Sequence, residues 1–116
     1  MRPALSSCLT KDERAALDGA VLLDPERLDA AVVGVMTVTA SPVAVYDYDA
    51  LVHLLQEDIG DLEETEGWVD YNTLRALAYM GPRAPVVLRR LDDDPRVFDP
   101  EELVDFRGKK WLRCRG

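Results

Sequence analysis

Six residues in the middle of the chain have side chains that could bind a small ligand or a divalent cation. They are Asp47, Tyr48, Asp49, Asp70, Asn72 and Arg75. Clustered carboxylate and amide oxygens are the ligands that hard cations prefer, and an arginine beside them could hold an anionic group. We expect the six to converge if the helix that carries Asp70 packs on the strand that ends at Asp47. The residues do not indicate a particular metal, and we predict no cofactor for this site.

A simpler interpretation of the same residues is structural. Asp49 stands where a helix N-cap is expected, and Asp47 stands at a strand end, so both carboxylates have a local role without any ligand. Asn72 and Thr73 are poor helix formers that compete with the backbone for hydrogen bonds, which is typical of a local cap. Ligand binding and local structure therefore both stay open for this cluster.

The sequence contains no recognisable catalytic motif. His53 is the only histidine, and it lies on a predicted helix with no nucleophile nearby in the sequence. The glycines form neither a dinucleotide-binding pattern nor a phosphate loop, and the serines form no nucleophile elbow. We therefore expect a protein that is not an enzyme, although an enzymatic use of the Asp47 to Arg75 cluster is the alternative.

Charge is distributed unevenly along the chain, which has a net charge of -8. Between Leu28 and Leu74 there is no Lys or Arg, whereas the same span holds ten carboxylates. Such a span repels phosphates, so nucleic acid is disfavoured as the main ligand, and a basic protein surface is favoured as a partner. The predicted partner-binding residues are Asp58, Asp61, Glu63, Glu64 and Glu66. In the alternative interpretation, the basic C-terminal segment folds over the acidic span and neutralises it.

The chain is predicted to be an α+β domain with a small antiparallel sheet and two to four short helices. Residues 32–48 are β-branched and apolar around a central Ser-Pro, which is typical of a hairpin, and residues 85–91 form a further strand, with 109–114 as a possible fourth. Helical spacing of leucines follows Asp49 and ends at Gly60, and Asp61 opens the next helix.

The ends of the chain carry weaker signals. A capping box at residues 10–13 predicts a short helix from Arg14 to Asp18, and Asp-Pro-Glu at 24–26 and 99–101 predicts two more helix starts. Cys8 and Cys114 are predicted to be free thiols, since neither a zinc-binding spacing nor an export signal is present. We expect one domain over residues 1–116, located in the cytoplasm, with no membrane span.

One part of the sequence resembles a known group of proteins. The stretch at residues 42–49, the leucine-rich helix that follows, and Trp68-Val-Asp-Tyr-Asn-Thr-Leu-Arg-Ala-Leu77 resemble a family of small phage- and prophage-borne proteins, usually described as uncharacterised. The resemblance covers residues 29–88, with 1–28 and 92–116 as extensions. Gly67 and Ala78 depart from the family pattern, which tends to have an acidic residue and a proline there.

The resemblance implies a mobile-element setting and no activity. Small acidic proteins of phage origin often occupy a surface of a host protein, so it implies a protein that binds a host or phage macromolecule and inhibits host defence. A virion component that self-associates is a third option. Neither the partner nor the oligomeric state is predicted.

Overall fold

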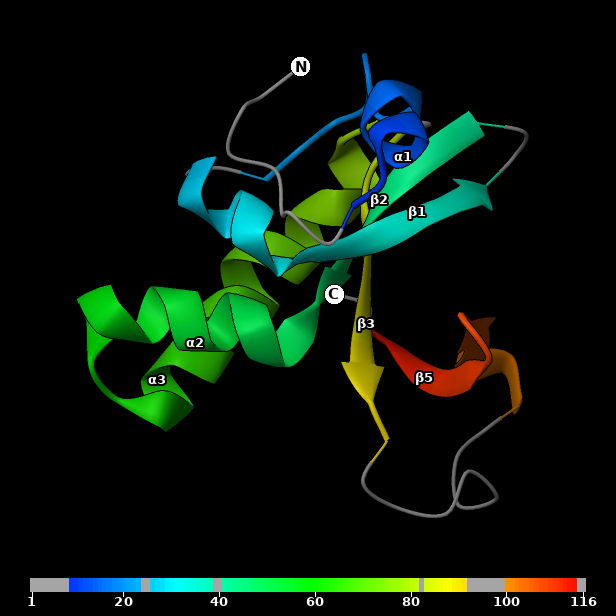
Figure 1. Ribbon diagram of the computed structural model, residues 1–116. Helices are drawn as coiled ribbons and strands as arrows, with labels where there is room; N and C mark the ends of the chain where they lie inside the picture. Colours follow the sequence, from blue (N-terminus) through cyan, green and yellow to red (C-terminus); the bar gives the residue numbers. More distant parts are fainter. Residues whose placement is uncertain (1–8, 24–25, 39–40, 82, 92–99, 115–116) are drawn as a thin grey trace.

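A five-stranded sheet forms the centre of the structure, and helices cover one of its sides (Figure 1). This computed structural model describes residues 9–23, 26–38, 41–81, 83–91 and 100–114. The strands are β1 (Val32–Val38), β2 (Ser41–Asp47), β3 (Val86–Arg90), β4 (Leu103–Phe106) and β5 (Lys109–Cys114). Their order in the sheet is β1-β2-β3-β5-β4. The predicted α+β class, the hairpin and the strands at 85–91 and 109–114 are confirmed.

The strand pairs are antiparallel except where β2 lies beside β3, which is a parallel pair with Val45 opposite Val86. The expectation of a purely antiparallel sheet is therefore wrong at this one pair. A parallel pair needs a long crossover connection, and the whole helical segment between Asp47 and Val86 provides it. This crossover places the helices beside β2, β3 and β5.

The strand β4 is absent from the sequence-based prediction. Its four residues are too few to show an alternating pattern, and its connection to β5 is only two residues long. Arg107 and Gly108 make this turn with φ of 53° and 77°, the left-handed conformation that a tight hairpin needs. The C-terminal segment thus supplies two strands, and one of them, β5, pairs with β3.

The helical elements follow the predicted starts with local corrections. They are α1 (Lys11–Ala16), the 3-10 turn η1 (Glu26–Ala31), α2 (Tyr48–Ile59), α3 (Leu62–Trp68), the π-helical η2 (Val69–Leu74), and the 3-10 turns η3 (Arg75–Tyr79) and η5 (Pro100–Glu102). The capping box at Thr10 is confirmed, but α1 begins at Lys11 and not at Arg14. Asp24 and Asp99, the other predicted starts, lie outside the described residues.

The N-cap of α2 is Asp47, not Asp49 as the sequence suggested. Asp47 is the last residue of β2 and keeps an extended backbone, so its carboxylate can accept from the amides of Asp49 and Ala50, at 3.0 and 3.3 Å. Gly60 ends the helix as predicted, with a φ of 90° that favours glycine.

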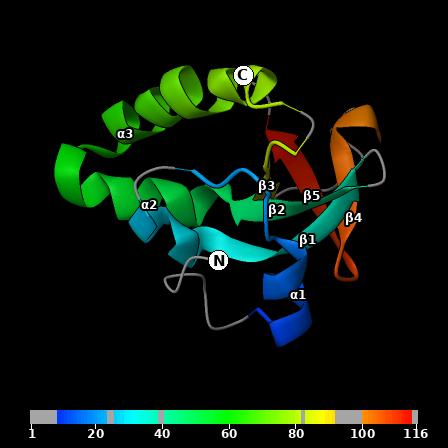
Figure 2. The same cartoon turned by 90° about the horizontal axis from the view of Figure 1, so that it is seen from above.

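The sheet buries side chains on both faces and curls along its length (Figure 2). One cluster lies between the sheet and the helices and contains Leu28, Tyr46, Leu51 and Val87. The other cluster lies inside the curl, where the Phe106 ring packs against the backbone of Gly34. Within the described residues, no helix is long and apolar enough to cross a bilayer.

Candidate functional site

The outer part of the molecule is a continuous helical run made of α3, η2 and η3. It leaves α2 at Gly60 and returns alongside it toward the end of β5 (Figure 2). Asp61 caps its start by accepting from the Glu64 amide at 2.9 Å. This run carries most of the residues that the sequence singles out.

Of the two interpretations of Asn72 and Thr73, the local helix cap is wrong. The run passes through them as a π-helical turn with no side-chain cap at either end. Asn72 Nδ2 donates to the carbonyl oxygen of Trp68 at 3.1 Å, four residues earlier in the same run. Bonding to its own backbone is the local competition expected of asparagine, and single π turns occur often at functional sites.

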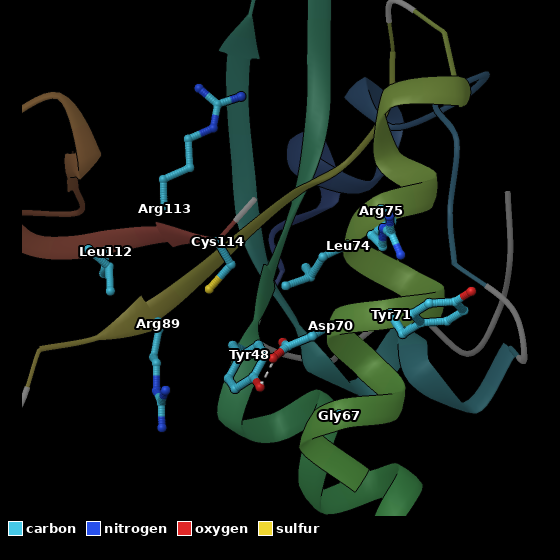
Figure 3. Close-up of a pocket in the computed structure, with 10 residues that line it drawn as sticks. All are labelled: Tyr48, Gly67, Asp70, Tyr71, Leu74, Arg75, Arg89, Leu112, Arg113 and Cys114. Carbon is cyan, nitrogen blue, oxygen red and sulfur yellow. Dashed lines mark hydrogen bonds between the residues drawn. The ribbon is translucent and has the colours of Figure 1, made fainter. Parts of the chain in front are cut away.

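A hollow of about 530 Å³ lies between the helical run and the edge formed by β3 and β5 (Figure 3). The helical side is formed by Gly67, Asp70, Tyr71, Leu74 and Arg75. These positions are spaced as one face of a helix. Figure 3 shows Asp70 and Leu74 directed toward the strands, whereas the side chains of Tyr71 and Arg75 lie on the other side of the helical run.

The opposite side of the hollow is formed by Tyr48, Arg89, Leu112 and Cys114. Arg113 also borders the hollow, but its side chain points away from Cys114 (Figure 3). Alternation along β5 explains this, because successive side chains of a strand project to opposite faces. A pocket of this size is within the range of small-molecule sites.

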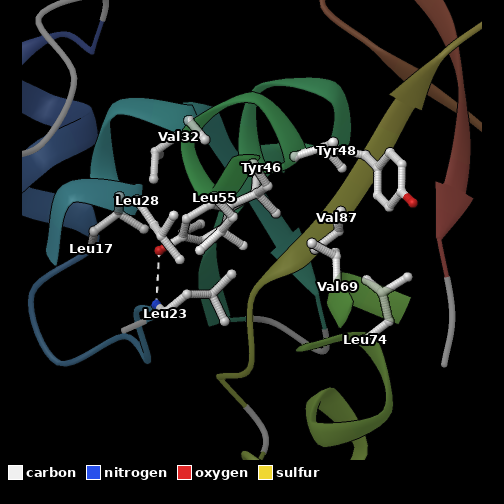
Figure 4. Close-up of a cluster of buried hydrophobic side chains, with 14 of the residues drawn as sticks. Leu17, Leu23, Leu28, Val32, Tyr46, Tyr48, Leu55, Val69, Leu74 and Val87 are labelled. Carbon is white, nitrogen blue, oxygen red and sulfur yellow. Dashed lines mark hydrogen bonds between the residues drawn. The ribbon is translucent and has the colours of Figure 1, made fainter. Parts of the chain in front are cut away.

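The Tyr48 hydroxyl donates to Asp70 Oδ1 at 3.1 Å, which joins the strand side of the hollow to the helical side. Burial raises the pKa of Tyr48, and the nearby Asp70 carboxylate raises it further, so this phenol stays protonated near neutral pH. Tyr48, Val69, Leu74 and Val87 belong to one buried cluster beneath the hollow (Figure 4). The floor of the hollow is therefore held by the core.

Two arginines at the hollow lie over tyrosine rings. Arg89 Cζ is 5.0 Å from the centre of the Tyr48 ring, and Arg75 Cζ is 4.9 Å from the centre of the Tyr71 ring. Stacking of this kind leaves the N–H edge of a guanidinium open to a planar acceptor. Arg89 also has long ion contacts, 3.6 Å to Asp49 and 3.7 Å to Glu66.

Cys114 carries a free thiol at the hollow. Burial raises its pKa to about 11, although the positive charge of Arg89 acts in the opposite direction. The thiolate is the reactive form of cysteine, so this group is a weak nucleophile near neutral pH. Cys8, the other predicted free thiol, lies outside the described residues.

The hollow brings together three of the six predicted ligand-binding residues, namely Tyr48, Asp70 and Arg75. Asp49 lies next to it through Arg89. Asp47 has a structural role instead, because it is buried, caps α2 and lies 3.2 Å from Arg90. Asn72 lies on the other flank of the helical run.

That flank has a second hollow of about 310 Å³, bordered by Val21, Leu23, Trp68, Asn72 and Met80. Asn72 and Asp70 therefore face different cavities. Among the residues that the structure describes, no group of three His, Cys, Asp or Glu side chains is placed to hold a metal ion.

Sequence reasoning missed Arg89, Leu112 and Cys114, which form the strand side of the first hollow. A signal was available in strand 85–91, where alternation puts Val87 and Arg89 on one face. The sequence could not show which face the helices cover, nor that β5 lies beside β3.

The predicted partner-binding residues gather where α2 ends and α3 begins. Asp58, Asp61, Glu63 and Glu64 are exposed there, whereas Glu66 is half-buried and lies near Arg89. Within the described chain, all the large hydrophobic side chains with high exposure lie on the same helical run. They are Leu62 (52% exposed), Trp68 (41%), Tyr71 (67%) and Tyr79 (90%).

Comparisons with protein-family models, with curated proteins and with solved structures give no significant match. The resemblance to phage-borne proteins therefore stays a prediction.

Proposed function

We propose that this protein binds a partner protein through its outer helical face, and that the partner presents a basic surface there. The outer helical face comprises the exposed acidic residues Asp58, Asp61, Glu63 and Glu64 together with the exposed Leu62, Trp68, Tyr71 and Tyr79. The observation that carries this proposal is the position of these hydrophobic side chains, all on the helical run that begins beside the exposed carboxylates of residues 58–64. Single exposed hydrophobic residues need no explanation, but several on one helical run favour an interaction surface.

The residue types fit a protein interface. Tryptophan and tyrosine are enriched among the residues that carry most of the binding energy, because they bury a large area at a low cost in side-chain entropy. The helical run holds these side chains on a fixed backbone. Burial of one such ring by a partner contributes on the order of 1.5–3 kcal/mol.

The carboxylates make the proposed binding selective for a basic partner. The exposed acids of the outer helical face have no Lys or Arg among their sequence neighbours from Leu28 to Leu74. Of the acids predicted to bind a partner, only Glu66 approaches the cation of Arg89. Their field speeds encounter with a basic surface, and this effect weakens as salt is added.

The resemblance to phage-borne proteins supports a host protein as the partner. Occupation of a nucleic-acid-binding surface would suit a face of carboxylates and aromatic rings, because such surfaces are basic. An inhibitor of host defence is the specific form of this proposal.

The experiment compares capture of partners by three forms of the chain from the cells that produce it. One variant combines Glu63→Gln and Glu64→Gln, which belong to the outer helical face, with Glu57→Gln, an exposed acid next to Asp58 in α2. The control combines Asp12→Asn, Glu102→Gln and Asp105→Asn, which remove the same charge from exposed positions elsewhere.

The captured protein is then purified, and its association rate with each form is measured at low and high salt. We expect the first variant to associate about tenfold more slowly at low salt and the control to match the unmodified chain. Equal rates for all three forms would refute a role for these carboxylates. Equal loss in both variants would show that net charge acts, and not this face.

A further inference from the structure

We propose that the hollow between the helical run and β3/β5 binds a small organic molecule that carries one carboxylate. Its carboxylate would pair with Arg89, and its apolar body would lie on Leu74, Leu112 and Cys114 toward Arg75. This site lies beyond the proposed protein-binding function and does not depend on it.

The main support is the hydrogen bonding of the arginines. Arg83 donates to the carbonyls of Ala16, Asp18 and Pro42. Arg90 and Arg107 lie 3.2 and 2.6 Å from carboxylates. By contrast, the guanidinium groups of Arg75 and Arg89 stack on tyrosines and donate no hydrogen bond within the described part of the chain.

A guanidinium has five donors in a planar fork that matches a carboxylate, so Arg89 has a large unused donor capacity. Its contacts with Asp49 and Glu66, at 3.6 and 3.7 Å, are longer than hydrogen bonds. Both acids are partly exposed, with side-chain exposures of 55% and 32%. A ligand carboxylate at hydrogen-bond distance would therefore gain a contact that these two acids do not make.

The rest of the hollow fits an apolar body. Leu74 borders it on the helical side and Leu112 on the strand side, and the Cys114 thiol is neutral near pH 7 because burial raises its pKa. Asp70 is already joined to the Tyr48 hydroxyl. A few fixed polar groups in a mainly apolar cavity are typical of small-molecule sites.

The nearby acids also set the ligand's charge. Asp49 and Glu66 lie near Arg89, and Asp70 lies near Tyr48, so these acids would repel a doubly charged phosphate more than a single carboxylate. Of these two kinds of anion, the proposal therefore takes the carboxylate.

The test uses 3-phenylpropionate as the probe, with 3-phenylpropionamide and 3-phenylpropylamine as neutral and cationic molecules of the same shape. Each is titrated into the full chain while the backbone amides of Tyr48, Leu74, Arg89 and Cys114 are followed by NMR. We expect saturable shifts at these amides with the carboxylate, and affinities at least about tenfold lower for the other two.

Three variants locate the carboxylate. Arg89→Gln should lower the affinity about tenfold, and Arg75→Gln about threefold. Lys109→Gln is the control, since Lys109 is exposed on β5 and does not border the hollow, and it should leave the affinity unchanged. Because Arg89 contacts α2 and α3, its variant is first checked for an unaltered amide spectrum away from the hollow.

If Arg89→Gln fails to fold, two other measurements test the site. One is the affinity of Arg75→Gln, and the other is whether bound 3-phenylpropionate protects Cys114 from an alkylating reagent. Saturable shifts with retained affinity in Lys109→Gln support the proposal. It is overturned if the carboxylate gives no saturable shift, if the amine binds as well, or if Lys109→Gln weakens binding as much as Arg75→Gln. None of these outcomes depends on the acids used to test partner binding.

Discussion

Arg83 connects three parts of the chain, and its replacement by methionine gives the clearest test of how the N-terminal segment is held. Its guanidinium donates to the carbonyls of Ala16 at 3.0 Å, Asp18 at 2.9 Å and Pro42 at 2.9 and 3.1 Å. Ala16 is the last residue of α1, Asp18 follows that helix, and Pro42 belongs to β2. Arg83→Met keeps the aliphatic stem and removes every donor.

The magnitude follows from these contacts. A hydrogen bond to a charged donor contributes about 1.5–3 kcal/mol when it is buried. The bonds to Ala16 and Pro42 are partly buried and the bond to Asp18 is exposed, so water can reach some of these carbonyls after the change. We therefore expect a loss of about 2–4 kcal/mol in the free energy of unfolding.

The assay is urea unfolding followed by the fluorescence of Trp68 and Trp111. Arg113→Met is the control, since the Arg113 side chain has no hydrogen bond or ion pair within the described residues. This change should alter stability by less than about 0.5 kcal/mol. Arg83→Lys, which keeps the charge but not the fork, should fall between the two. A loss below about 1 kcal/mol for Arg83→Met would refute the assignment of Arg83 as the connection.

Three further changes follow from the packing and the charges. Gly34→Ala should destabilise the chain by about 1–3 kcal/mol, because its Cβ would lie 2.5 Å from the Phe106 ring; unchanged urea unfolding would contradict the curl of the sheet. Gly67→Ala should stabilise it by about 0.5–1 kcal/mol, since this helical glycine has open space around a new Cβ; a loss would contradict the helix there. In a Cys8→Ser background, Cys114, with its pKa raised to about 11, should react with iodoacetamide about a hundredfold more slowly at pH 8 than in urea. Equal rates would contradict its burial. The raised pKa means that the folded chain favours the neutral Cys114 thiol. The contribution of this thiol to the free energy of unfolding is therefore complete below pH 9 and is lost as the pH rises toward 11.

The elements with local signals were predictable from the sequence. The hairpin at 32–48 is β-branched, and the end of α2 at Gly60 requires a positive φ, so short stretches of sequence determine both. The N-cap of α2 was misplaced by two residues for a physical reason. Asp47 and Asp49 both suit a cap, and the choice depends on where β2 stops, which is set by its pairing with β3.

Features that depend on distant residues were not predictable. Four residues of β4 form a strand only because Arg107 and Gly108 turn the chain back onto β5. Asp70 and Asn72 are two positions apart, yet they border different hollows, because the helical run presents one flank to the strands and the other to Val21 and Leu23. The pairing of Tyr48 with Asp70 and the place of Arg89 also required the tertiary structure.

The most direct measurement for the proposed function is site-specific photo-crosslinking in the cells that produce the protein. Benzoylphenylalanine replaces Tyr71 or Tyr79 on the outer helical face, and Lys109, which is exposed on β5, is the control position. We expect positions 71 and 79 to crosslink to one protein through a segment rich in Lys and Arg, and position 109 to give no such product. Crosslinking at position 109 alone, or to the same extent at all three positions, would contradict binding through the outer helical face.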